Sequence, residues 1–87
     1  YPIEFEKVEG IDAELTDIIV PFNSQAVGRM IKELNVPEKC LIMLILRSNK
    51  FVIPAGATVI QEGDVLLVLA NAEDFSVLQQ TLTRLKE

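Results

Sequence analysis

The sequence contains no histidine, and it has a single cysteine among its 87 residues. Without histidine, the chain cannot form a Ser-His or Cys-His catalytic pair or an imidazole metal site. The one cysteine, Cys40, excludes an internal disulfide and suits a reducing compartment. Cys40 precedes an apolar stretch, so we interpret it as an inert buried thiol, with a redox-sensitive thiol as the alternative.

Phosphate-binding glycine patterns are also missing, because neither Gly-x-Gly-x-x-Gly nor a Walker-type loop occurs. The serines stand at expected caps or turns without an adjacent base. Acidic pairs such as Glu62 and Asp64 could bind a divalent cation through their oxygens, although a solvated surface explains them more simply. We interpret Asp64 as a turn residue whose side chain bonds to nearby backbone amides. The sequence therefore predicts no catalytic residue, no metal ligand and no enzyme activity.

Basic residues are few, with eight Lys and Arg against 13 Asp and Glu and a net charge of −5. This balance argues against binding to a nucleic-acid backbone or to an anionic membrane surface. No apolar run reaches the roughly 18–20 residues that span a bilayer, and no signal-peptide pattern is present. Since the first residue is Tyr1 and not Met, we expect a piece of a longer chain.

Hydrophobic residues are abundant for so short a chain, at 49%, and the mean hydropathy is +0.31. A chain of this length forms one domain near the lower limit of independent folding. Either the core is very dense or part of the apolar surface meets a partner.

Periodicity and turn signals predict an α+β fold in the order β-β-α-β-β-β-α. Residues 1–8 alternate between apolar and acidic side chains, which is typical of a half-buried strand. The other expected strands are residues 13–22, 41–46, 51–53 and 65–70. We predict a small mixed or mainly antiparallel sheet of four to five strands, with two helices on one face.

The first helix is expected over residues 24–34, with Asn23 or Ser24 as N-cap and an apolar stripe through Val27, Ile31 and Leu34. The second is expected after Asn71, which can cap it. Two of the strands, residues 41–46 and 65–70, are continuously apolar, whereas a sheet open to water on one side should alternate. Their second face is covered either by the N-terminal segment or by a twin subunit.

The stretch Pro54-x-Gly56-x-Thr58-x-Ile60-x-x-Gly63-Asp64-x-Leu66-x-Val68 resembles the RCK C-terminal domain, also called the TrkA-C domain. The opening Ser24-x-x-x-Gly28 matches the same family. The resemblance assigns residues 13–87 to a regulatory TrkA-C-like domain and leaves residues 1–12 as an N-terminal strand or docking linker. Family members carry their dinucleotide-binding fingerprint in a separate lobe, so the resemblance implies no NAD or ATP site in this chain.

The resemblance implies a cytoplasmic regulatory domain of a potassium transporter or a cation/proton antiporter, on the cytoplasmic side of the bacterial inner membrane. Its expected partners are a second copy of itself and the membrane-embedded part of the transporter, with no nucleic acid and no direct insertion into the membrane. The alternative is a ligand-free oligomerisation module that holds transporter subunits together. A third reading is a separate small-molecule sensor that controls transcription or an enzyme.

Some members of the family bind cyclic di-AMP between two such domains, through polar side chains after the first helix and on the next strand. The corresponding positions here are Pro37 and Met43, which offer no side-chain donors. We therefore predict no cofactor and keep cyclic di-AMP as an open alternative. The polar residues expected near the interface, and thus our candidate ligand-binding residues, are Asn35, Arg47, Ser48 and Asn49.

Overall fold

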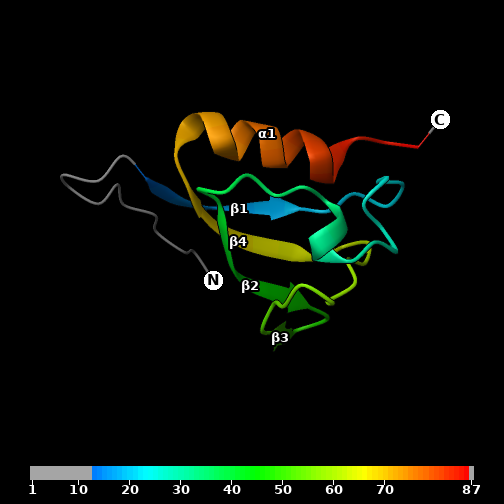
Figure 1. The fold of residues 1–87 in the computed structure, drawn as a ribbon. Helices are drawn as coiled ribbons and strands as arrows, with labels where there is room; N and C mark the ends of the chain where they lie inside the picture. Colours follow the sequence, from blue (N-terminus) through cyan, green and yellow to red (C-terminus); the bar gives the residue numbers. More distant parts are fainter. Residues whose placement is uncertain (1–12, 87) are drawn as a thin grey trace.

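The structure is a computed structural model that describes residues 13–86 (Figure 1). Its elements follow in the order β1 (Glu14–Ile19), the 3-10 turn η1 (Ile31–Glu33), β2 (Leu41–Arg47), β3 (Lys50–Val52), β4 (Val65–Ala70) and α1 (Ala72–Thr83). The predicted strand at residues 1–8 lies outside the described residues.

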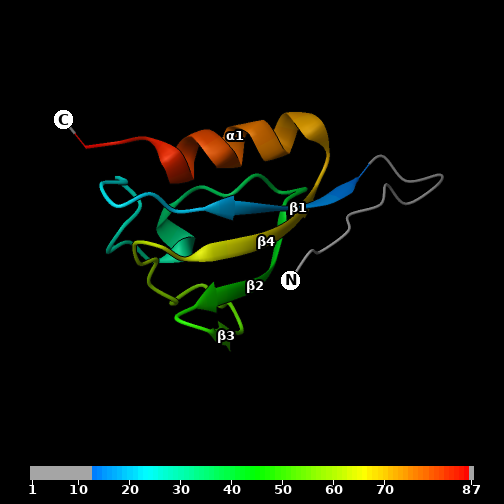
Figure 2. The ribbon, with the colours of Figure 1, turned by 180° about the vertical axis from the view of Figure 1, so that it is seen from behind.

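The four strands form one sheet in the order β1-β4-β2-β3, and every neighbouring pair is antiparallel. The two continuously apolar segments, β2 and β4, are the central strands. Figures 1 and 2 show α1 on one side of this sheet, where it contacts β1 and β4. We call the side under α1 the closed face and the opposite side the open face.

Burial alternates along β4, with Leu66, Val68 and Ala70 buried on the closed face. On β2, both Ile42 and Ile45 are buried although they are three residues apart. The register between β2 and β4 shifts between Ile42 and Leu44. Such a β-bulge places one extra residue on a strand, and so brings Ile42 and Ile45 to the same face.

The hydrophobic core lies between the closed face, α1 and the segment that joins β1 to β2. Its buried members are Ile18, Val20, Ala26, Leu34, Ile42, Ile45, Ile60, Leu66, Val68, Ala70, Leu78 and Leu82.

Helix α1 begins as its sequence predicted. The side chain of Asn71 accepts a hydrogen bond from the backbone N–H of Asp74 at 2.7 Å, which satisfies one of the free amides of the first turn. Acidic Glu73 and Asp74 in that turn favour the positive end of the helix dipole. Leu78 and Leu82, four residues apart, are fully buried against the sheet.

The predicted helix over residues 24–34 is wrong, since the segment forms turns and only the short 3-10 turn η1. Gly28 has a φ of +86°, a left-handed value that ends any right-handed helix at this point. The backbone N–H of Gly28 donates to the carbonyl of Ile60 at 2.8 Å, and that of Lys32 donates to Gly56 at 3.0 Å. Backbone pairing with a distant segment has therefore replaced the local helical hydrogen bonds.

Ser24 does not act as the expected N-cap of a helix. Its hydroxyl donates to the carbonyl of Leu82 at 2.6 Å and accepts the N–H of Ala26 at 3.0 Å. Ser24 also forms an isolated antiparallel bridge with Leu85. These contacts attach the chain after α1 to the segment after β1, and so fix the two walls of a cavity described below.

The α+β class and the mainly antiparallel sheet of four strands are confirmed. The correction concerns the helices, because one α-helix and one 3-10 turn stand where two α-helices were predicted. The strand bounds agree within a few residues, and β4 matches its predicted range.

Candidate functional site

The open face of the sheet is apolar along the rows that cross its central strands. Residues opposite one another in the register share this face, in the rows Leu15–Leu69–Leu41, Asp17–Leu67–Leu44 and Ile19–Val65–Leu46, with Phe51 opposite Leu46 on β3. Ile19 is 62% exposed, Leu41 is 56% exposed and Phe51 is 68% exposed. A contiguous apolar surface of this kind typically marks a contact with another protein segment.

Among the predicted ligand-binding residues, Arg47 already has a partner inside the domain. Its Nε and Nη2 donate to the two carboxylate oxygens of Asp64 at 2.9 and 2.7 Å, and Nη2 also donates to the carbonyl of Val59 at 2.9 Å. The hydrogen bond to the Asp64 carboxylate raises the pKa of Arg47 above its usual value. Asp64 is fully buried and also accepts the backbone N–H of Gln61 at 2.9 Å.

This arrangement confirms that Asp64 bonds to a nearby amide, and it adds an ion pair that the sequence did not indicate. A bidentate pair between a guanidinium and a carboxylate is geometrically rigid. It fixes the end of β2 to the start of β4. These bonds engage Nε and Nη2, which leaves the two N–H groups of Nη1 for a ligand.

The other predicted site residues share one backbone property. Asn35, Ser48 and Asn49 have φ values of 53°, 51° and 65°. Ser48 and Asn49 form the two-residue turn between β2 and β3, because Arg47 pairs directly with Lys50. Positive φ at both central residues is the mark of a type I′ hairpin turn. Asn35 follows η1 instead, so the structure keeps Arg47, Ser48 and Asn49 together and places Asn35 on a separate surface.

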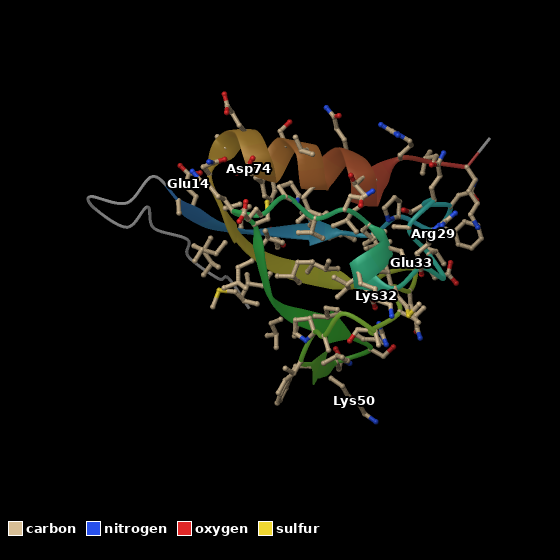
Figure 3. All side chains as sticks on the ribbon, viewed as in Figure 1. Glu14, Arg29, Lys32, Glu33, Lys50 and Asp74 are labelled. Atoms are coloured by element: carbon tan, nitrogen blue, oxygen red, sulfur yellow. The ribbon has the colours of Figure 1, made fainter. Side chains whose placement is uncertain are left out.

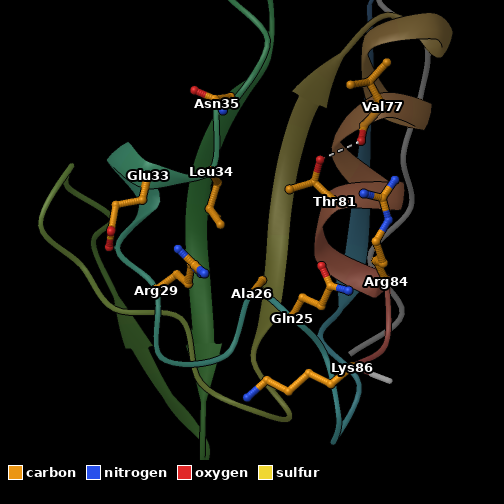
Figure 4. A pocket seen from close by; sticks show the side chains of 10 residues that line it. All are labelled: Gln25, Ala26, Arg29, Glu33, Leu34, Asn35, Val77, Thr81, Arg84 and Lys86. Atoms are coloured by element: carbon orange, nitrogen blue, oxygen red, sulfur yellow. Dashed lines mark hydrogen bonds between the residues drawn. The ribbon is translucent and has the colours of Figure 1, made fainter.

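Asn35 lines a cavity of about 710 Å³ between α1 and the segment of residues 25–35 (Figure 4). We call it the basic cavity, because Arg29, Arg84 and Lys86 also line it. Sequence reasoning missed these three residues. Arg29 lies in the segment where the predicted helix does not form, and the hydrogen bond that brings Lys86 beside Asn23 has no sequence signal.

A second, smaller cavity of about 220 Å³ is mainly apolar and is lined by Ile31, Cys40, Ile42 and Pro54 among others. Burial, followed by the negative charge of Asp74, raises the pKa of the Cys40 thiol. A raised pKa lowers the thiolate fraction at neutral pH. This agrees with an inert thiol.

Within residues 13–86, no three side chains of Cys, Asp or Glu are grouped so that they could share a metal ion. No helix in this part of the chain is long and apolar enough to cross a membrane.

The TrkA-C domain profile matches residues 15–83. The chain belongs to the TrkA-C domain family. The sequence resemblance is thereby confirmed, and it extends over β1, the whole sheet and α1. TrkA-C domains have a regulatory and not a catalytic role, so this domain is not an enzyme.

Curated relatives of this TrkA-C domain belong to potassium transport. A Trk system potassium uptake protein TrkA homolog from Archaeoglobus fulgidus is 30% identical over 78 residues, which are 90% of this chain and 18% of that protein. The K(+)/H(+) antiporter NhaP2 of Shewanella sp. (strain ANA-3) is 28% identical over 65 residues, which are 75% of this chain and 11% of the antiporter. The chain therefore spans less than a fifth of the relatives that it matches.

Solved structures share the fold. The RCK_C domain dimer of S. agalactiae BusR in complex with c-di-AMP is 27% identical, with a TM-score of 0.68 over 78% of this chain and 93% of that one. The GsuK channel bound to NAD is 21% identical with a TM-score of 0.65, over 82% of this chain and 14% of that one. The GsuK likeness concerns the fold alone.

Proposed function

We propose that this TrkA-C domain regulates a monovalent-cation transport protein, either a potassium system or a sodium or potassium/proton antiporter. In this proposal, the domain lies on the cytoplasmic side of the bacterial inner membrane. It acts as a homodimer and biases the membrane-embedded part of the transporter between two states. The support comes from the relatives, which include a potassium uptake protein and a K(+)/H(+) antiporter.

The apolar open face is the observation that supports a homodimer. We propose that a second copy of this chain packs against it. Leucine side chains such as Leu41 lie on the central strands of that face. Leaving this apolar surface exposed to water is unfavourable compared with burying it against a partner. BusR, whose domain has the same fold, forms an RCK_C domain dimer. An isologous contact between two open faces would bury these rows against each other.

Sedimentation of the 87-residue chain tests this interface. Leu41→Glu places a charge on the open face, and we expect it to weaken the dimer at least tenfold. Val77→Glu is the matched control, because Val77 is similarly exposed, at 51%, but lies on α1 at the other side of the sheet. A wild-type chain that sediments as a monomer, or equal weakening by both variants, would contradict the proposed interface.

A ligand at the dimer interface regulates only through different affinities for the two states of the transporter. Cyclic di-AMP is the first ligand to test, since it is bound by the BusR RCK_C dimer. Asn35, Arg47, Ser48 and Asn49 remain the candidate ligand-binding residues. A ligand that binds only the folded state at 100 times its Kd adds about 2.7 kcal/mol of stability, which a thermal melt detects.

No thermal shift with cyclic di-AMP, in a chain that still dimerises, would favour the ligand-free oligomerisation module. The ion pair of Arg47 with Asp64 supports that second candidate, because it occupies the one cation of the predicted site. Membrane-spanning segments elsewhere in the parent gene would support the transporter assignment. A DNA-binding domain there would contradict it, as in BusR, which binds promoter DNA.

A further inference from the structure

The basic cavity brings together basic residues from separate parts of the chain. Three of the eight Lys and Arg residues of this acidic chain line it, namely Arg29, Arg84 and Lys86. In the described part of the chain, the one ion pair joins Arg47 to Asp64, so none of these three cations has a carboxylate within 4.0 Å there. Among residues 13–86, no ion pair competes with an anion from solution for these cations.

The three cations come from different walls. Figure 4 shows Arg29 on the segment of residues 25–35, Arg84 at the end of α1, and the Lys86 side chain extending from the C-terminal segment toward the opposite wall. One acidic residue, Glu33, also lines the cavity. Its Oε1 accepts the backbone N–H of Met30 at 2.9 Å, and Figure 4 shows its carboxylate directed away from Arg84 and Lys86.

A purely structural role explains only part of this cluster. Arg84 is the C-cap of α1, where a cation interacts favourably with the negative end of the helix dipole. Arg29 belongs to a different segment, and Lys86 lies beyond the helix. The helix dipole falls off within its last turn and does not require either of them.

The other lining residues indicate which class of ligand the cavity can bind. Ala26 and Leu34 are buried members of the core and form an apolar floor. Gln25, Asn35 and Thr81 add amide and hydroxyl groups, which both donate and accept hydrogen bonds. None of the lining residues is aromatic, so no aromatic side chain there can stack on a nucleobase. A volume of about 710 Å³ greatly exceeds that of a bare ion and falls within the range of small-molecule sites.

We propose that the basic cavity binds a small phosphorylated polyol of the sugar-phosphate class, with its phosphate between Arg29, Arg84 and Lys86 and its hydroxyls toward Gln25, Asn35 and Thr81. Guanidinium groups bind phosphate oxygens through paired, charge-assisted hydrogen bonds. The uncharged polar groups complete a set of donors and acceptors that a polyol satisfies and a bare anion does not.

This site goes beyond the proposed function. All its residues come from one chain and lie on the α1 side of the sheet, whereas the proposed dimer uses the open face. A failure of the dimer test therefore leaves this proposal intact, and the converse also holds.

Titration of the ¹⁵N-labelled 87-residue chain with glucose 6-phosphate tests the site, with amide chemical shifts as the readout. We expect the largest shifts at the amides of Gln25, Arg29, Asn35 and Thr81. Glucose, inorganic phosphate and AMP are titrated in parallel, and each is expected to bind at least tenfold more weakly. Saturable binding of glucose 6-phosphate elsewhere on the chain, or no binding, would overturn the proposal.

The charge dependence of binding is tested with Arg29→Gln combined with Arg84→Gln. This double variant should bind glucose 6-phosphate at least tenfold more weakly than the wild type. The matched control combines Lys39→Gln with Lys50→Gln, which removes the same charge at exposed positions outside the cavity. Figure 3 shows Lys50 well away from Arg29. Equal weakening by both pairs would mean nonspecific attraction. Equal affinity for inorganic phosphate would reduce the site to an anion site and overturn the ligand class.

Discussion

The two faces of the four-stranded sheet carry similar aliphatic side chains but are covered differently. On the closed face, Leu66 and Val68 are fully buried under α1 and the segment that joins β1 to β2. On the open face, the alternate residues of the same strand, Leu67 and Leu69, are only partly buried. Composition alone therefore does not decide which face forms the core. The position of α1 and of the joining segment decides it, and the remaining face is left for a partner.

Neighbouring leucines on β4 provide the strongest test of this difference. Leu66→Ala removes a fully buried side chain and should lower the free energy of unfolding by about 2–5 kcal/mol. Leu67→Ala should lower it by only about 1 kcal/mol when the chain is monomeric. Urea unfolding at low protein concentration measures both.

The same pair of variants also probes the dimer. At high protein concentration, a dimer formed through the open face should make Leu67→Ala more destabilising than at low concentration, while the effect of Leu66→Ala stays nearly constant. Equal losses at every concentration would show that the two faces do not differ.

The ion pair between Arg47 and Asp64, at the polar end of the closed face, should give the next largest effect on the free energy of unfolding. Asp64→Ala leaves the guanidinium of Arg47 and the amide of Gln61 without their partner. Removing one member of a buried pair costs about 3–5 kcal/mol, and we expect the lower end, about 3 kcal/mol, because Arg47 is 25% exposed. Glu62→Ala is the control, since this exposed acid should change stability by less than about 0.5 kcal/mol. A small effect of Asp64→Ala in urea unfolding would mean that the ion pair is not needed to hold β2 to β4.

Local signals in the sequence predicted the parts of the fold whose hydrogen bonds are local or whose apolar pattern is continuous. Gly63-Asp64 and the run behind it located β4, and Asn71 located the start of α1. The helix over residues 24–34 failed because the amides of Gly28, Ile31 and Lys32 pair with residues 56–60, and no local pattern reports that partner. The candidate site depended on distant pairing as well, since Arg47 was predicted as a ligand-binding residue and Asp64 as a turn residue, whereas the two form an ion pair. Only the folded chain brings Arg29 and Arg84 to one cavity.

The helix that covers the closed face can be weakened without changing a core residue. Asn71→Ala removes the hydrogen bond to the N–H of Asp74 and should lower the free energy of unfolding by about 1 kcal/mol. Ser76→Ala, at an exposed position within α1, should be neutral or slightly stabilising. Thermal unfolding followed by circular dichroism compares the two variants. If Asn71→Ala also changed the dimer in sedimentation, the two faces would be coupled, contrary to the separation proposed here.

The smallest effect is expected at the hairpin of the edge strand β3, whose residues are the least buried in the sheet. Ser48 and Asn49 adopt positive φ, and Asn-Gly is the preferred pair for a two-residue turn of this kind. Ser48→Asn combined with Asn49→Gly should therefore raise the free energy of unfolding by about 0.5 kcal/mol. Urea unfolding measures the gain, and a loss would mean that the native side chains make contacts beyond the turn.

The same variant separates two roles for these residues. Suppose that cyclic di-AMP raises the melting temperature of the wild type but not that of the stabilised variant. Ser48 and Asn49 would then contact the ligand. If binding is unchanged, their side chains serve the turn alone.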